Sequence, residues 1–131
     1  MPTQIKAALI YDFDGTLAEG NVQEHSFMPR HDIDPSDFWA DVKETAKEQD
    51  ADEILVYMRK MLEVDRGDSG PITKSVLQKH GADTPLFMGT NDWFSRINEY
   101  AKDRNVELEH YIISSGIYEM IQGCTIAKHF K

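Results

Sequence analysis

A short apolar run that ends in two closely spaced acids is the feature that most restricts how this 131-residue chain can fold. Residues 5–11 read Ile-Lys-Ala-Ala-Leu-Ile-Tyr, a nearly continuous apolar stretch. A run of this length is typical of a strand that is buried on both faces of a parallel sheet. Asp12 and Asp14 follow directly, so the sequence predicts carboxylates at the carboxyl end of this strand.

A second run of the same kind begins at Leu108 and ends at Ile113, and the polar sequence Ser114-Ser115-Gly116 follows it. Residues 93–101 repeat apolar side chains at helical spacing before this strand, and residues 117–121 do so after it, up to Gly123. Helix, strand, polar tip and helix in this order predict an open parallel α/β sheet with its reactive groups at the strand tips.

Three further helices are predicted between the first strand and the helix of residues 93–101. Asp34-Pro35 is a helix start signal for a segment that reaches about Gln49, and a short third helix follows Thr73 and stops at Gly81. The second helix runs over about 52–65 and has its apolar residues at helical spacing, namely Ile54, Leu55, Met58, Met61 and Leu62. We call residues 21–88 the helical block, and predict that it is a cap inserted into a core formed by residues 1–20 and 89–131.

The two acids after the first strand point to phosphate chemistry. Alternate residues of an extended chain point to the same side, so Asp12 and Asp14 can reach one substrate. Gly15 and Thr16 allow a sharp turn that brings main-chain amides toward a ligand, and a magnesium ion would offset the repulsion between the acids. The pattern therefore predicts a site for a charged, oxygen-rich group such as phosphate.

Two other interpretations of these acids are a solvated strand end and a calcium loop. Acidic residues before a glycine are common in turns, and Asp-x-Asp taken alone fits a solvated strand end equally well. An EF-hand calcium loop requires a third oxygen ligand before its glycine and a glutamate at its twelfth position. Gly15 comes too early and Gln23 occupies the twelfth position, so the calcium interpretation fails.

The residues around both strand tips resemble known signature motifs. Residues 10–17, Ile-Tyr-Asp-Phe-Asp-Gly-Thr-Leu, look like the first motif of the haloacid dehalogenase (HAD) superfamily. Residues 111–116, Tyr-Ile-Ile-Ser-Ser-Gly, are similar to its second motif, closest to the form in phosphoserine-phosphatase-like members. The helical block resembles the cap of these enzymes. The resemblance implies an HAD-like Rossmannoid parallel sheet core, partial in this chain, with an inserted all-helical cap.

The resemblance also implies a magnesium-dependent phosphatase that acts on a small phosphorylated metabolite. Asp12 would attack phosphorus and become an aspartyl-phosphate, while Asp14 would protonate the leaving oxygen and then activate water. An Asp12 carboxylate oxygen and the Asp14 carbonyl would bind Mg2+. Ser114 and the Ser115 amide would hold a phosphoryl oxygen, beside Gly15 and Thr16. Asp14 argues against dehalogenation, which has no leaving alcohol to protonate, so phosphatase and phosphomutase are both left open.

Part of the pattern that the resemblance implies is missing. A Lys or Arg at the start of a later helix and one or two further acids cannot be placed, because Lys128 and Lys131 come too soon after the second motif. We therefore expect a truncated chain, or an engineered or disordered remainder. A non-catalytic HAD-like fragment that binds a phosphorylated ligand or a partner chain is the alternative, and exposed sheet edges would favour self-association.

Charge and cysteine content exclude several classes of function. The formal charge of −9, from 14 Lys and Arg against 23 Asp and Glu, disfavours nucleic acids and anionic membrane surfaces as partners. Cys124 is the single cysteine, which excludes an internal disulfide and a zinc site with several thiolates. The N-terminal residues lack a signal-peptide pattern and no run has the roughly twenty apolar residues of a membrane span, so we expect a cytoplasmic protein.

Histidines and tryptophans are not predicted to form a metal or cofactor site. The histidines show no ligand spacing and are expected at the surface or as local caps; they are His25, His31, His80, His110 and His129. Trp39 and Trp93 are expected to pack in the core.

Overall fold

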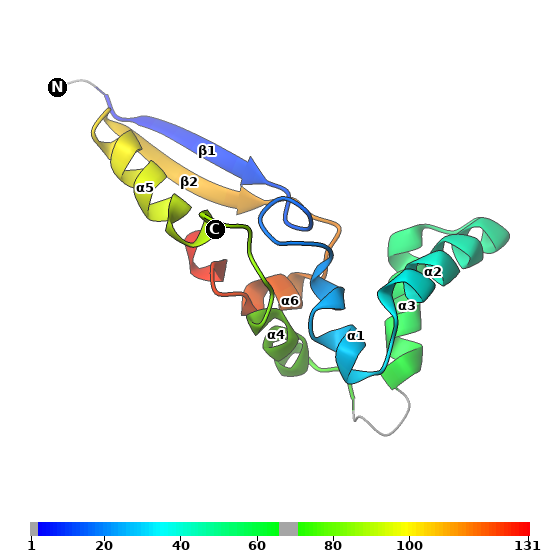
Figure 1. The fold of residues 1–131 in the computed structure, drawn as a ribbon. Coiled ribbons are helices and arrows are strands. Elements are labelled where there is room, and N and C mark those ends of the chain that lie inside the picture. The colour runs from blue at the N-terminus through cyan, green and yellow to red at the C-terminus, as the bar shows by residue number, and fades with distance from the viewer. Residues whose placement is uncertain (1–2, 66–70) are drawn as a thin grey trace.

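The chain is a mixed α/β protein built on a short parallel sheet. The computed structural model describes residues 3–65 and 71–131, and in this part it contains six α-helices and a two-stranded sheet (Figure 1). Strands β1 (Ile5–Tyr11) and β2 (Val106–Ile112) pair in parallel, with Ile5 opposite Val106 and Tyr11 opposite Ile112. The predicted parallel α/β arrangement of the two strands is therefore confirmed.

The sheet is covered on one face, not on two. Helix α5 (Thr90–Lys102) leads into β2 and packs along it, and the other helices near the sheet lie on the same side (Figure 1). Residues of β1 alternate between exposed and half-buried, and Ile5 and Ile10 are 61% and 62% exposed. The expected burial of β1 on both faces was wrong, because a second helical layer is missing from the described part of the chain.

The helical block begins with a 3-10 turn η1 (Val22–Glu24) and a short helix α1 (Phe27–Arg30), which the sequence did not predict. The three predicted helices are present as α2 (Pro35–Gln49), α3 (Glu53–Asp65) and α4 (Lys74–Ala82). Their start signals act as expected, since the Asp34 side chain accepts the Asp37 N–H at 3.0 Å and Thr73 caps α4. No helix in the described ranges is long and apolar enough to cross a membrane.

Helix α3 buries Met61 as predicted, but the rest of its buried face differs from the predicted one. Its buried side chains are Val56, Tyr57 and Met61, whereas Leu55 and Leu62 are 67% and 54% exposed. The reason is that α3 packs mainly against α2, and the two helices form a pair at one end of the molecule (Figure 1). Helical spacing identified the helix correctly but could not identify which apolar side has a partner.

Helices α4 and α6 (Tyr118–Gly123) cross at backbone contact distance. A Cβ atom on Gly81 would lie 1.7 Å from the Met120 carbonyl oxygen, and one on Gly123 would lie 1.8 Å from the Gln78 carbonyl oxygen. Only glycine permits such an approach at both points. The last helix of the helical block is thus packed against the helix that follows β2.

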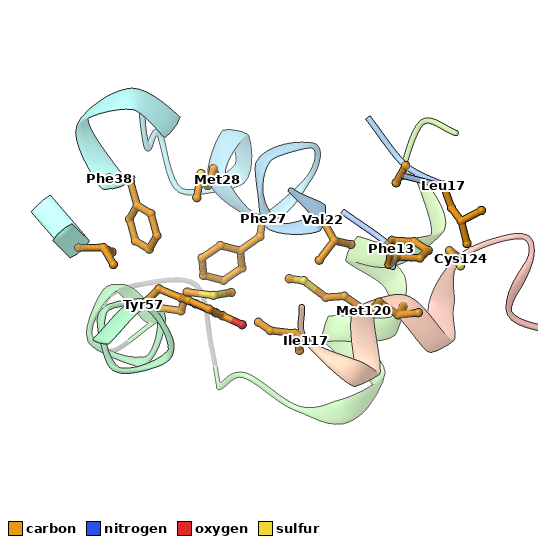
Figure 2. Packing of buried hydrophobic residues seen from close by; sticks show 14 of the residues in the cluster. Phe13, Leu17, Val22, Phe27, Met28, Phe38, Tyr57, Ile117, Met120 and Cys124 are labelled. Atoms are coloured by element: carbon orange, nitrogen blue, oxygen red, sulfur yellow. The ribbon is translucent and has the colours of Figure 1, made fainter. Parts of the chain in front are cut away.

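A single hydrophobic core joins the helical pair to the end of the sheet. Figure 2 shows it running from Phe38 and Tyr57 through Phe27 and Met120 to Phe13, which directly follows Asp12. Phe13, Phe27 and Met120 are at most 1% exposed. The residues that flank the acids are therefore held by packing that reaches into the helical block, and the division into core and cap remains a prediction.

Two of the five histidines are buried, which corrects the expectation of surface positions. His110 is 3% exposed, with Nδ1 2.9 Å from the Tyr11 hydroxyl and Nε2 2.8 Å from Asn98 Oδ1. His80 is 6% exposed and its Nδ1 lies 2.8 Å from Ser26 Oγ. Hydrogen bonds to the ring nitrogens offset the loss of water at these sites, and sequence spacing carries no signal of such partners.

Candidate functional site

The carboxyl ends of β1 and β2 meet at one edge of the sheet. The Ile113 N–H donates to the Tyr11 carbonyl oxygen at 2.9 Å, which extends the pairing to the last residue before each polar tip. Asp12 and Ser114 therefore leave the sheet side by side. This is the geometry that the two apolar runs predicted, because parallel strands in register end at the same edge.

Gly116 shows how closely the two tips approach. A Cβ atom at this position would lie 3.1 Å from Asp14 Oδ2 and 3.2 Å from Ser114 Oγ. The Asp14 carboxylate and the Ser114 hydroxyl thus border one small space, which a side chain at residue 116 would enter. The structure therefore brings together one predicted site residue from each strand tip.

The two carboxylates lie in different surroundings. Asp12 is exposed, and its Oδ1 accepts the N–H of Phe13 at 2.8 Å. Asp14 is half-buried, and its Oδ1 accepts the Val22 N–H at 3.0 Å. Burial raises the pKa of Asp14 and the charges of Asp12 and Glu24 raise it further, against the opposing effect of the Val22 bond. Asp12 is thus the accessible carboxylate of the two, and Asp14 is the one whose surroundings favour the protonated form.

Main-chain amides of the loop after β1 donate hydrogen bonds to carbonyl oxygens of the same loop. Gly15 has a φ of 73°, which favours glycine, and its N–H points to the carbonyl oxygens of Ala18 at 2.8 Å and Gly20 at 3.1 Å. The Thr16 N–H donates to the Phe13 carbonyl oxygen at 3.1 Å. Both predicted amides are therefore engaged inside the loop. The exposed Thr16 keeps its hydroxyl as the group that can reach a ligand.

The two serines after β2 point to different partners. Ser114 is half-buried and its Oγ accepts the Gly116 N–H at 3.0 Å, the local turn bond expected of a serine at a strand end. Ser115 is exposed, and its carbonyl oxygen accepts a hydrogen bond from the Tyr57 hydroxyl at 2.7 Å. Of the pair, Ser114 is the residue whose hydroxyl borders Asp14.

Helices α2 and α3 each send one aromatic side chain to the site loops, which the sequence did not predict. Tyr57 of α3 is 4% exposed and its hydroxyl donates to the Ser115 carbonyl oxygen at 2.7 Å. Burial, together with the charge of Asp14, raises the pKa of Tyr57 to about 12. Trp39 of α2 donates through Nε1 to Glu24 Oε1 at 2.6 Å. These bonds tie the helical pair to the loops that carry Asp14 and Ser114.

Replacing Tyr57 with phenylalanine should destabilise the chain by about 1 kcal/mol, because it removes the buried hydroxyl that donates to the Ser115 carbonyl oxygen. Urea unfolding measures the effect. Tyr100→Phe is the control, since the Tyr100 side chain is 56% exposed and its loss of a hydroxyl should change stability by no more than about 0.5 kcal/mol. Equal unfolding midpoints for the two variants would contradict the assigned link.

The candidate site offers two carboxylates and one nearby lysine. Among residues 3–65 and 71–131 no group of three or more His, Cys, Asp or Glu side chains is placed to hold a metal ion. Lys131 lines a cavity of about 230 Å3 together with Ser114 and Gly116. Its Nζ lies 2.9 Å from Glu109 Oε1, so this lysine is held by another acid.

Comparison with known proteins gives a relative but no function. No family model matches the sequence, and no solved structure matches the chain. A protein of Borreliella burgdorferi that is described as an uncharacterized protein is 32% identical over 132 aligned residues. The match covers 93% of this chain and 46% of that protein, so the chain spans about half the length of this relative.

Proposed function

We propose that this chain carries the nucleophile and the proton donor of a magnesium-dependent phosphatase of the HAD type, which acts on a small phosphate monoester. The observation that supports the proposal most strongly is the convergence at Gly116, where Asp14 and Ser114 border one space beside the exposed Asp12. A turn that merely ends a strand does not require a serine from a second strand at the same point. A cytoplasmic setting is part of the proposal, because the single cysteine, Cys124, is a buried free thiol.

The two acids suit different steps of such a reaction. A carboxylate oxygen of Asp12 attacks phosphorus, the bond from phosphorus to the leaving oxygen breaks, and the proton of Asp14 passes to that oxygen. Asp14 then takes a proton from water, whose oxygen attacks the phosphorus of the aspartyl-phosphate and releases phosphate. Ser114 donates its hydroxyl hydrogen to a phosphoryl oxygen, which orients the group for attack.

A magnesium ion fits this pair of acids, although they supply only part of a ligand set. The charges of Asp12 and Glu24 raise the pKa of Asp14 and the charge of His25 opposes them, and carboxylate oxygens are the donors that Mg2+ prefers. When bound, the ion would neutralise charge on the transferring phosphoryl group. The remaining acid and the lysine that the resemblance implies are not assigned to residues of this chain.

Phosphate release from an aryl phosphate tests the proposal. We expect release by this chain that requires Mg2+, stops on chelation and returns when Mg2+ is restored. Without the lysine and the further acid that the resemblance implies, we expect phosphate release to be slow. The same measurement should therefore be repeated on a longer form of the protein that includes any sequence beyond Lys131. Binding of phosphate without turnover in both forms would favour the non-catalytic alternative and overturn the phosphatase proposal.

A further inference from the structure

A second cavity lies away from the acids, between the segment around α1 and the helix α4. Its volume is about 310 Å3, and none of Asp12, Asp14 and Ser114 lines it. The aromatic ring of Phe27 forms part of its wall and lies against the rings of His31 and His80, at 4.5 Å and 5.6 Å between centroids. The polar side chains that line it are Ser26, Arg30, His31, Lys79, His80 and Asp83.

The charge of this cavity is opposite to that of the protein. Among the described residues that line it are two side chains with permanent positive charge, Arg30 and Lys79, two imidazoles and the carboxylate of Asp83, in a chain whose formal charge is −9. His80 responds to these charges. Burial lowers the pKa of His80, the charges of Arg30 and His31 lower it further, and the charge of Asp83 opposes them. Clustered like charges without enough counter-charge are unfavourable unless an anion joins them.

The buried imidazole has a fixed orientation. Its Nδ1 is engaged by the Ser26 hydroxyl at 2.8 Å, and no other hydrogen bond of the ring is present in the described part of the chain. A histidine whose Nδ1 is held in this way can present Nε2–H to a ligand as a donor. Arg30 and Lys79 are exposed and can reach the same ligand from the rim.

We propose that the cavity between α1 and α4 binds a small phosphate-type oxyanion. His80 and Ser26 form the fixed inner part of this site, and Arg30 and Lys79 supply the positive charge around it. A tetrahedral dianion has acceptor oxygens in several directions, which matches donors that come from two separate segments. The site is independent of the phosphatase proposal, since it uses none of the residues at the strand tips.

Titration with inorganic phosphate, followed by the NMR signals of the histidine rings, tests this site. We expect saturable shifts of the His80 and His31 signals, and an affinity about tenfold lower in the double variant Arg30→Gln/Lys79→Gln. Lys74→Gln is the matched control, because Lys74 is an exposed lysine of the same helix that does not line the cavity. The affinity should be unchanged in Lys74→Gln and in Asp12→Asn.

Three results would overturn the proposal. The first is the absence of saturable shifts, and the second is an equal loss of affinity in Lys74→Gln, which would indicate general charge screening. The third is equal binding of acetate, which would show a carboxylate site instead of a phosphate site. If the double variant fails to fold, the single variant Lys79→Gln should still weaken phosphate binding, because the side chain is exposed and its loss leaves the core intact.

Discussion

Replacing Asp12 with asparagine should lower magnesium-dependent phosphate release by about a thousandfold or more, which follows if this carboxylate is the nucleophile. An amide has nearly the same shape as a carboxylate but does not attack phosphorus. Asp12 is exposed and its Oδ1 accepts only a local bond from the Phe13 N–H, which an asparagine oxygen can also accept. The free energy of unfolding should therefore change by no more than about 0.5 kcal/mol.

An isosteric change elsewhere gives the control for this prediction. Asp32→Asn makes the same chemical change at an exposed residue with a φ of 53°, a conformation that asparagine also adopts, and it should leave the rate unchanged. Phosphate release and urea unfolding are measured on all three proteins. A rate in Asp12→Asn within a few fold of the parent rate would remove Asp12 from the mechanism.

Replacing Gly81 with alanine should destabilise the chain by about 3 kcal/mol or more, the largest effect on stability that we expect from a single methyl group. The new Cβ would lie 1.7 Å from the Met120 carbonyl oxygen, and 2.6 Å from its carbon. Both neighbours are backbone atoms of α6, so no side-chain rotation relieves the overlap. The two helices have to separate, which opens the core around Met120.

Whether Gly81→Ala lowers or raises the free energy of unfolding distinguishes an effect of packing from an effect of helix propensity. At an exposed helical position, alanine in place of glycine stabilises a helix by about 1 kcal/mol. Gly123→Ala, which meets the Gln78 carbonyl oxygen at 1.8 Å, should destabilise the chain in the same way, whereas Ser75→Ala on the exposed side of α4 should have little effect. Urea midpoints of the two glycine variants at or above the parent value would show that the helices do not cross at this distance.

Local sequence patterns predicted the helices and strands, but they could not predict which of these pack against one another. Strand β1, strand β2 and the start of α2 follow from runs, periodicity and the cap at Asp34, all of which lie within a few residues. The burial of β1 and the buried face of α3 depend on what packs against them. Ile10 and Leu55 are exposed because their predicted side of the element has no partner in the described chain.

The candidate site was predictable to the extent that it lies at strand tips. Asp14 and Ser114 come together because the strands before them are parallel and in register, which apolar runs can indicate. Tyr57 could not be found in this way, because its role depends on the Ser115 carbonyl, a group that every residue has. The burial of His80 could not be predicted either, because its hydrogen-bond partner Ser26 is distant from it in the sequence.

The pairing of β1 with β2 has a consequence for the order in which the chain acquires its structure. Ile5 pairs with Val106, so the sheet joins segments that are far apart in the sequence, whereas α2 and α3 are neighbours in the sequence and meet in a local hairpin. Closing a long loop is slower than local helix pairing. On a ribosome, Asp12 and Asp14 would emerge well before Ser114 and stay without it until the helices between the two strands have been synthesised.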